Sequence, residues 1–268
     1  MIDLKKILLP VSGNHSIIEA VITLFLTNPI IKPERFEELI KKDFKERFQK
    51  FEKVNQVQFK VKGKEGGALE SNPPLIQENV GFKFQRYEEG KIVAALQGVN
   101  ELLRNFISYH TLNYTDWDLF LPDFKSVLTT VSDFHPNLFV NAFSLHYIDE
   151  FMWDDETEIE TKMIFNENST LLPKEFFSCS LNNYQFTTVK KNEFEYFDRL
   201  EIKVDDRPQK YITISHNVIS NFNDNIALNE LLKSSQLNEM LNHAHLLNKK
   251  TLVNILAKDV CDIIKISI

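Results

Sequence analysis

Hydrophobic and polar positions recur with two different spacings along this chain, and each spacing predicts a type of element. Residues 17–26 are apolar and rich in β-branched side chains, which predicts a buried strand. In residues 32–51, large apolar side chains recur every three or four positions, which predicts an amphipathic helix of about five turns. Residues 79–98 predict a hairpin with Glu89 and Gly90 at its tip. The first part of the chain therefore mixes strands with helices.

The stretch NYTDWDLFLPDF, residues 113–124, is open to two interpretations, a recognition loop or the entry to a buried helix. Tyr114 and Trp117 are three apart, and apolar residues continue at helical spacing to Val131, which favours a helix packed on a sheet. Thr115 or Asp116 can cap its start. Pro122 removes a backbone donor, so we expect a turn or kink before a regular helix that starts close to it. On this interpretation, Trp117→Ala lowers stability far more than it alters any specific binding.

The second half of the chain is predicted to repeat the order of strands and helices of the first half less regularly. A strand is expected over 138–151, another over 157–165, three more between 184 and 222, and helices at the C-terminal end. We therefore predict an α+β fold with two strand-helix-strand lobes, mainly antiparallel sheets and C-terminal helices. The lobes are residues 1–150 and residues 151–268, and the second is interpreted as a divergent repeat of the first.

Composition and charge narrow the class of protein. The 268 residues include 22 Phe and only 7 Gly, which is typical of a globular protein with an ordered core. A net charge of -7, with no long run of one sign, argues against a nucleic-acid partner. No apolar stretch is long enough for a membrane span. Cys179 and Cys261 lie far apart and outside any metal-ligand spacing, so a reducing cytoplasm is the expected location.

Several stretches, taken in order, resemble a sporadically distributed family of uncharacterised bacterial proteins of similar length. The family pattern PIxEAV corresponds to SIIEAV at residues 16–21, its YxxW helix entry to Tyr114 and Trp117, and its RYxN strand to HYID at residues 146–149. Ser16 stands where the family has proline, and the arginine and asparagine of RYxN are also replaced. The resemblance implies no catalytic residues, and its sporadic distribution suits a bacterial mobile or phage-defence gene cassette.

Candidate site residues come from the same two stretches. We assign a binding role to Tyr114, Trp117, His146, Tyr147 and Asp149, and leave the catalytic residues unknown. Alternation along a strand places His146 and Asp149 on opposite faces, so they are not expected to pair. The acidic residues after Asp149 lack the spacing of a calcium loop, and no metal site or cofactor is predicted.

Two functions follow as hypotheses. The first is a noncatalytic protein-binding or regulatory protein with a protein partner or self-association, because no phosphate-binding loop or nucleophile elbow occurs in the sequence. The alternative is an enzyme of unfamiliar type, a hydrolase or nuclease, with a site near His146 and Asp149.

Overall fold

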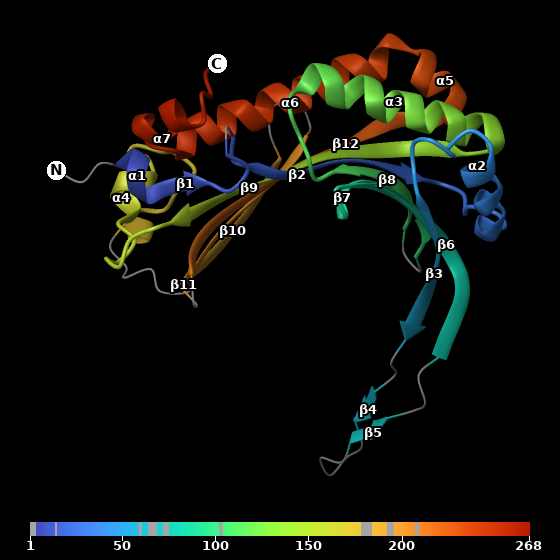
Figure 1. Cartoon of the computed structure of the whole chain (residues 1–268), viewed down its shortest axis with the longest axis horizontal. Helices are drawn as coiled ribbons and strands as arrows, with labels where there is room; N and C mark the ends of the chain where they lie inside the picture. Colours follow the sequence, from blue (N-terminus) through green and yellow to red (C-terminus); the bar gives the residue numbers. More distant parts are fainter. Residues whose placement is uncertain are drawn as a thin grey trace.

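The computed structural model describes residues 4–13, 15–58, 61–63, 69–71, 75–101, 104–177, 184–191, 196–206 and 209–268. Ten of the described strands form one open antiparallel sheet in the order β10-β11-β12-β9-β2-β8-β7-β6-β3, with β1 paired to one end of β9 (Figure 1). Its strands are β1 (Leu8–Pro10), β2 (Ile17–Leu26), β3 (Lys50–Gln58), β6 (Leu75–Glu88), β7 (Lys91–Asn100), β8 (Asn105–Thr111), β9 (Phe139–Trp153), β10 (Tyr184–Lys191), β11 (Phe197–Asp206) and β12 (Lys210–Ala227). A separate pair, β4 (Val61–Gly63) and β5 (Leu69–Ser71), extends beyond the β3–β6 end.

Helices cover one face of this sheet. The helical segments are α1 (Leu4–Ile7), η1 (Pro33–Phe36), α2 (Glu37–Lys41), α3 (Trp117–Phe134), α4 (Thr161–Ile164), η2 (Lys174–Phe177), α5 (Leu228–Lys233), α6 (Ser235–Ile255) and α7 (Lys258–Ile263). α3, α5 and α6 lie along the sheet, which curves away from them, so its other face is concave, and none of the described helices covers it (Figure 1). None of the described helices is both long and apolar enough to cross a membrane.

Alternation along each strand explains this layering. In β12, Ile212, Ile214 and Val218 are buried beneath the helices, whereas the intervening Thr213 and Ser215 are half-buried on the concave face. One packed and one wetter face is the usual state of an antiparallel sheet. The predicted α+β class, antiparallel pairing and C-terminal helices are confirmed.

The centre of the sheet joins distant parts of the chain. β9 lies between β2 and β12, with Leu145 opposite both Ile22 and Val218. Strands from residues 1–150 and from residues 151–268 thus share one sheet, and the proposed boundary falls inside β9. Apolar side chains between sheet and helices form two clusters, one centred under α3 and α5 and the other near α7. The division into two lobes stays a prediction.

The helix predicted over 32–51 is wrong in its length. η1 and α2 end at Lys41, Lys42 leaves helical geometry with φ -116° and ψ -94°, and β3 begins at Lys50. The apolar positions are nevertheless buried, because the turns after α2 bring Phe44 and Phe48 onto Phe84, with ring centroids 5.1 and 5.7 Å away. The hydrophobic spacing identified the core residues but not the path of the backbone.

Two further local expectations are wrong. Residues 157–165 form no strand; they lead into α4, and the Phe165 N–H donates to the Thr161 carbonyl at 2.7 Å. α3 begins at Trp117 and continues as one helix through Pro122 to Phe134. The proline removes only the bond to the Asp118 carbonyl, and Asp118 is an exposed residue of the first turn, where water can replace that bond.

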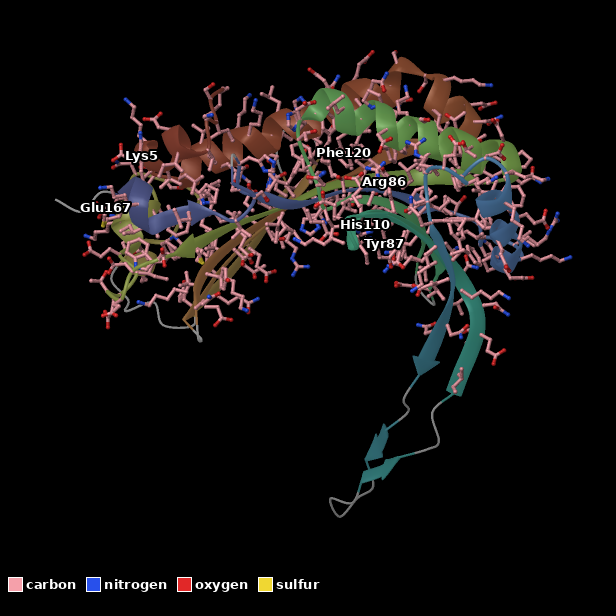
Figure 2. All side chains as sticks on the ribbon, viewed as in Figure 1. Lys5, Arg86, Tyr87, His110, Phe120 and Glu167 are labelled. Atoms are coloured by element: carbon pink, nitrogen blue, oxygen red, sulfur yellow. The ribbon has the colours of Figure 1, made fainter. Side chains whose placement is uncertain are left out.

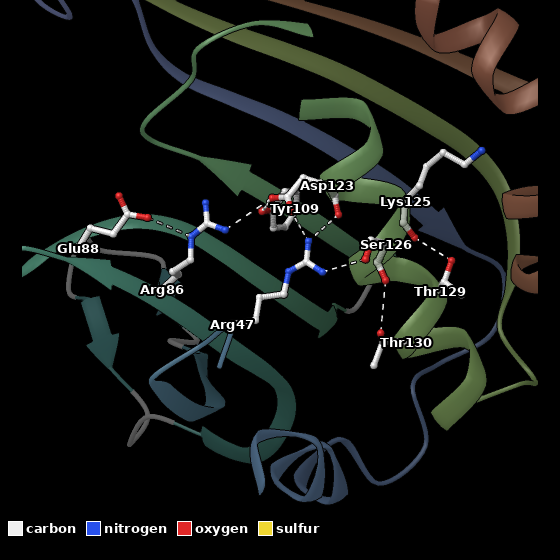
Figure 3. Close-up of polar contacts among 9 residues, drawn as sticks. All are labelled: Arg47, Arg86, Glu88, Tyr109, Asp123, Lys125, Ser126, Thr129 and Thr130. Atoms are coloured by element: carbon white, nitrogen blue, oxygen red, sulfur yellow. Dashed lines mark hydrogen bonds and ion pairs between the residues drawn. The ribbon is translucent and has the colours of Figure 1, made fainter. Parts of the chain in front are cut away.

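A cluster of charged residues attaches α3 to the β6–β8 side of the sheet (Figure 3). Asp123 of α3 accepts a hydrogen bond from the Tyr109 hydroxyl and pairs with Arg47, while Arg86 lies 3.7 Å from the same carboxylate. Arg47 also donates to Ser126 at 3.0 Å. One acidic side chain therefore connects three elements that are separate in sequence.

Candidate functional site

A pocket of about 500 Å³ opens beside the first turn of α3, on the helix-covered side of the sheet. It is lined by residues 15–17, by residues 114–118, by one side of α6 and by the C-terminal segment 264–266. Asp149 of β9 is also part of its lining, and we name it the Asp149 pocket. Five separate segments of the chain therefore build one concave site.

Asp149 is the most unusual group in this pocket. It is 1% exposed, and its Oδ1 accepts a hydrogen bond from the Ser16 hydroxyl at 2.6 Å. Ser16 is held in place by its own carbonyl, which accepts from the Glu150 N–H at 2.8 Å. The other oxygen, Oδ2, is buried without a hydrogen-bond partner among the described residues. Burial raises the pKa of Asp149 from 3.8 to about 6, although the Ser16 bond opposes this shift.

Aromatic rings form one wall of the Asp149 pocket. The Trp117 and His245 rings are stacked, with centroids 4.5 Å apart and planes 2° from parallel. The Trp117 indole N–H donates to Asn242 Oδ1 at 2.7 Å, which fixes the indole on α6. The Tyr147 hydroxyl lies 2.9 Å from His245 Nδ1, and Tyr114 meets the Tyr147 ring edge-on at 5.7 Å. The wall is therefore held by contacts between α3, α6 and β9.

Burial also sets the charge of this wall. It lowers the pKa of His245 to about 4, with a smaller contribution from Lys249, so the imidazole is neutral at pH 7. It raises the pKa of Tyr114 to about 12, so the phenol keeps its proton. The wall is thus an uncharged aromatic surface next to a carboxylate.

A second buried histidine lies close to the pocket. His216 of β12 is directly opposite Tyr147, and its Nδ1 is 3.0 Å from the side-chain amide nitrogen of Asn248, a residue that lines the pocket. Because an amide nitrogen donates, His216 Nδ1 accepts and the proton is on Nε2. Burial lowers the pKa of His216 to about 3, so this imidazole is also uncharged at pH 7.

The concave face carries a different polar cluster, which includes His110 (Figure 2). His110 Nδ1 lies 2.7 Å from Glu19 Oε1, and its Nε2 lies 2.9 Å from the Ser108 hydroxyl. On the same face, His146 Nε2 lies 2.7 Å from the Ser215 hydroxyl. The hydrogen bond with His110 lowers the pKa of Glu19, so the glutamate is ionised at neutral pH.

The structure separates the five predicted site residues into two groups. Tyr114, Trp117 and Asp149 line the Asp149 pocket, and Tyr147 is buried behind it. His146 lies on the opposite, concave face, as the alternation along the strand predicted. No shared His146–Asp149 site exists.

Sequence reasoning missed several members of the pocket, chiefly Ser16, His245 and Asn248. A signal for two of them was present on α6, where Asn242, His245 and Asn248 recur every three residues on one side of a leucine-rich helix. Ser16 carried no such signal. Of the cysteines, Cys179 lies outside the described residues, and burial raises the pKa of Cys261, which disfavours its reactive thiolate.

No protein-family model, curated protein or solved structure matches this chain. The class of protein is therefore described from its structure alone. It has a curved antiparallel sheet with helices on one face, and beneath the helices lies a pocket lined by aromatic rings and a carboxylate.

Asp149 makes a testable contribution to the pH dependence of stability. Because its pKa is about 6 in the folded chain and near 3.8 in an unfolded one, the folded state binds the extra proton between these values. Wild-type stability should therefore fall as pH rises from about 4 to 7, relative to Asp149→Asn, by about 3 kcal/mol in total.

Urea denaturation of both proteins across this pH range measures the difference. Asp133→Asn, on the exposed side of α3, controls for the loss of one carboxylate. A stability difference between Asp149→Asn and wild type that does not change with pH would show that the buried carboxyl titrates normally.

Proposed function

We propose that this chain is a noncatalytic protein-binding protein that holds a side chain or terminus of its partner in the Asp149 pocket. The observation that carries the proposal is a buried carboxylate with one unpartnered oxygen in an open pocket. Such a group costs the fold about 3 kcal/mol near neutral pH, as its raised pKa implies. A residue that destabilises the free protein is commonly retained for what it binds.

The pocket wall suits an anchor residue of a protein partner. Tryptophan and tyrosine are enriched among the residues that dominate protein interfaces, where they surround desolvated pockets. Here Trp117 and Tyr114 line the mouth, and both are held by neighbouring side chains before any partner arrives. A wall that is already ordered loses little conformational entropy on binding.

His245, in the aromatic wall, is poorly suited to general acid–base catalysis. General acid–base catalysis is most efficient when the pKa of the catalytic group is near the working pH. The pKa of His245, at about 4, is too low, and its ring is already engaged by Trp117 and Tyr147. The histidine therefore serves better as a binding surface than as a proton carrier.

Location and gene setting complete the proposal. A reducing cytoplasm suits a chain with two distant cysteines. The bacterial gene-cassette setting rests on the family resemblance alone. Gene neighbourhoods test it, because a gene found mainly in ordinary metabolic operons would contradict a mobile or defence role.

A pull-down from the native host tests the binding function. The tagged wild type, Trp117→Ala, Asp149→Asn and the control Leu119→Ala are compared by quantitative mass spectrometry. Leu119 is on the same helix turn but is 63% exposed and outside the pocket lining. We expect one stoichiometric partner with the wild type and the control, and about 30-fold weaker binding by Trp117→Ala.

Three outcomes would contradict the proposal. These are the absence of any stoichiometric partner, equal capture by all four proteins, or capture of a small molecule alone. Circular dichroism of each variant confirms that it is folded, so that lost capture is not mistaken for unfolding.

The second candidate function is hydrolysis on the concave face. Glu19, His110 and Ser108 are connected by hydrogen bonds in the order of a hydrolase triad, with distances of 2.7 and 2.9 Å. Ser108 is only 2% exposed, which limits access of a substrate carbonyl and makes this the weaker candidate. A fluorophosphonate probe tests it: labelling of the wild type that is lost in Ser108→Ala would favour the hydrolase over a binding protein.

A further inference from the structure

The free oxygen of Asp149 can accept from a positively charged or hydrogen-bond-donating ligand group. Its Oδ1 is occupied by Ser16, and Oδ2 is buried with no partner among the described residues. Burial raises the pKa of this carboxyl and the Ser16 bond opposes the shift, and no basic side chain among the described residues forms an ion pair with it. A buried, uncompensated carboxylate is costly, and a ligand that supplies the missing positive charge recovers that cost.

The aromatic wall selects among such ligands. Aromatic faces attract cations, most strongly when the cation is removed from water, and quaternary ammonium groups are recognised by cages of such rings. Tyr114, Trp117 and His245 line the pocket together with Asp149. His245 is neutral at pH 7 and does not repel a cation there. Carboxylate and rings are therefore suited to the same positively charged group.

The charged side chains at the mouth of the pocket do not change its preference for a positively charged ligand. Asp116 and Asp118 lie on the lining at the start of α3, and Lys249 and Lys265 lie on the α6 and C-terminal sides. These two pairs offset each other in formal charge. Among the Asp, Glu, Lys and Arg residues of the lining, the uncompensated formal charge is then that of Asp149.

We infer that the Asp149 pocket binds an organic ammonium group, with Asp149 as its counterion and Tyr114, Trp117 and His245 as its aromatic wall. This inference rests on the proposed function, because it names the group of the protein partner that enters the pocket. A lysine side chain or an N-terminal amine of the partner supplies that chemistry, and a free amine supplies the same chemistry without a protein.

Isothermal titration with matched probes tests the ligand class. Choline and 3,3-dimethylbutan-1-ol have the same shape, but only choline is charged; n-butylammonium adds N–H donors. We expect both cations to bind the wild type and the alcohol to bind at least about 10-fold more weakly, the equivalent of about 1.4 kcal/mol. Equal affinity for choline and its alcohol analogue would overturn the inference.

Two variants locate the binding. Asp149→Asn should weaken choline binding by about 30-fold or more, because a buried charge pair loses one partner. The control Asp133→Asn removes an exposed carboxylate at the far end of α3 and should bind choline as the wild type does. Unchanged choline affinity in Asp149→Asn would place the cation elsewhere. Because Asp149→Asn removes a destabilising charge, misfolding is not expected to obscure the result.

Chemical modification of the captured partner distinguishes a failure of this inference from a failure of the proposed function. The captured partner is either acetylated, which removes ammonium charge, or reductively dimethylated, which keeps it. The inference predicts that acetylation abolishes binding and dimethylation does not. If the acetylated partner still bound the wild type but not Trp117→Ala, the pocket would remain the protein-binding site and the ammonium assignment alone would be wrong.

Discussion

Phe124→Ala is expected to lower the free energy of unfolding by about 3–5 kcal/mol, which is the usual cost of removing a buried aromatic ring. Phe124 lies in the middle of α3 and is 0% exposed, packed in the larger apolar cluster between helices and sheet. Truncation leaves a cavity that the surrounding β-sheet cannot fill by collapsing. Chemical denaturation measured by tryptophan fluorescence or circular dichroism gives the difference directly.

Leu119→Ala is the matched control for this prediction. It shortens an apolar side chain of the same helix that is 63% exposed. Its effect should be within about 0.5 kcal/mol of zero, as for most surface substitutions. Similar losses in the two variants would mean that α3 does not pack on the sheet through Phe124.

Gly81→Ala should also be strongly destabilising, by about 3 kcal/mol. A Cβ at Gly81 would lie 2.2 Å from the carbonyl oxygen of Gly98 and 3.0 Å from the Val99 Cα, on the neighbouring strand. Both are backbone atoms, so no side-chain rotation relieves the clash. The smaller entropy of the unfolded chain with alanine offsets only about 0.4–1 kcal/mol of this. The strands β6 and β7 would have to separate.

Gly98→Ala provides the comparison on the partner strand. Its Cβ would lie 2.6 Å from Phe82 Cε1 and 2.7 Å from Ile30 Cδ1, which are the ends of side chains. We expect a smaller loss of unfolding free energy than for Gly81→Ala, because these groups can move by rotation. Thermal melting of the two variants side by side measures this order. A Gly81→Ala protein as stable as the wild type would refute the close approach of β6 and β7.

Much of the fold could be predicted from local pattern, and the failures share one cause. The strands β2 and β12 follow from alternation or from β-branched runs, and the β6–β7 hairpin from Glu89-Gly90, both of which have positive φ. The prediction of a helix over 32–51 was wrong because the apolar residues fit helical spacing, whereas the chain leaves the helix at Lys42. The turns that follow place Phe44 against Phe84. A continuous helix and a short helix followed by turns can both bury these side chains. Tertiary packing decides between them, and the spacing of apolar residues carries no information about it.

The candidate site was only partly accessible from sequence. Tyr114 and Trp117 were identified from the helical spacing and from the family resemblance, and Tyr147 and Asp149 from the resemblance. Their convergence needed the pairing of Ile17 with Asp149, which brings Ser16 to the carboxylate across 133 positions. It also needed α6 to place His245 on Trp117. The spacing on α6 places His245 on one side of the helix but does not show that it stacks on Trp117, and the Ser16 contact has no local sequence signal.

The stretch 113–124 is the helix entry that its spacing predicts, and it also borders the Asp149 pocket. Tyr114, Phe120 and Phe124 are buried, and the Asp116 side chain caps α3 by accepting from the Leu119 N–H at 2.8 Å. Trp117, in contrast, is half-buried at the pocket lining. The segment thus contains the start of α3, and Trp117, the first residue of that helix, forms part of the pocket wall. We therefore expect Trp117→Ala to reduce partner binding, in addition to the stability loss that its spacing alone predicts.

Hydrogen exchange of the chain, alone and with its captured partner, tests the binding role of the Asp149 pocket most directly. Peptides covering residues 114–120 and 264–268 contain the pocket mouth on α3 and the C-terminal segment. The proposed function predicts slower exchange in both when the partner binds, and no change in β10, which lies at the far edge of the sheet. Slower exchange confined to β10 and β11, with the pocket segments unchanged, would contradict it.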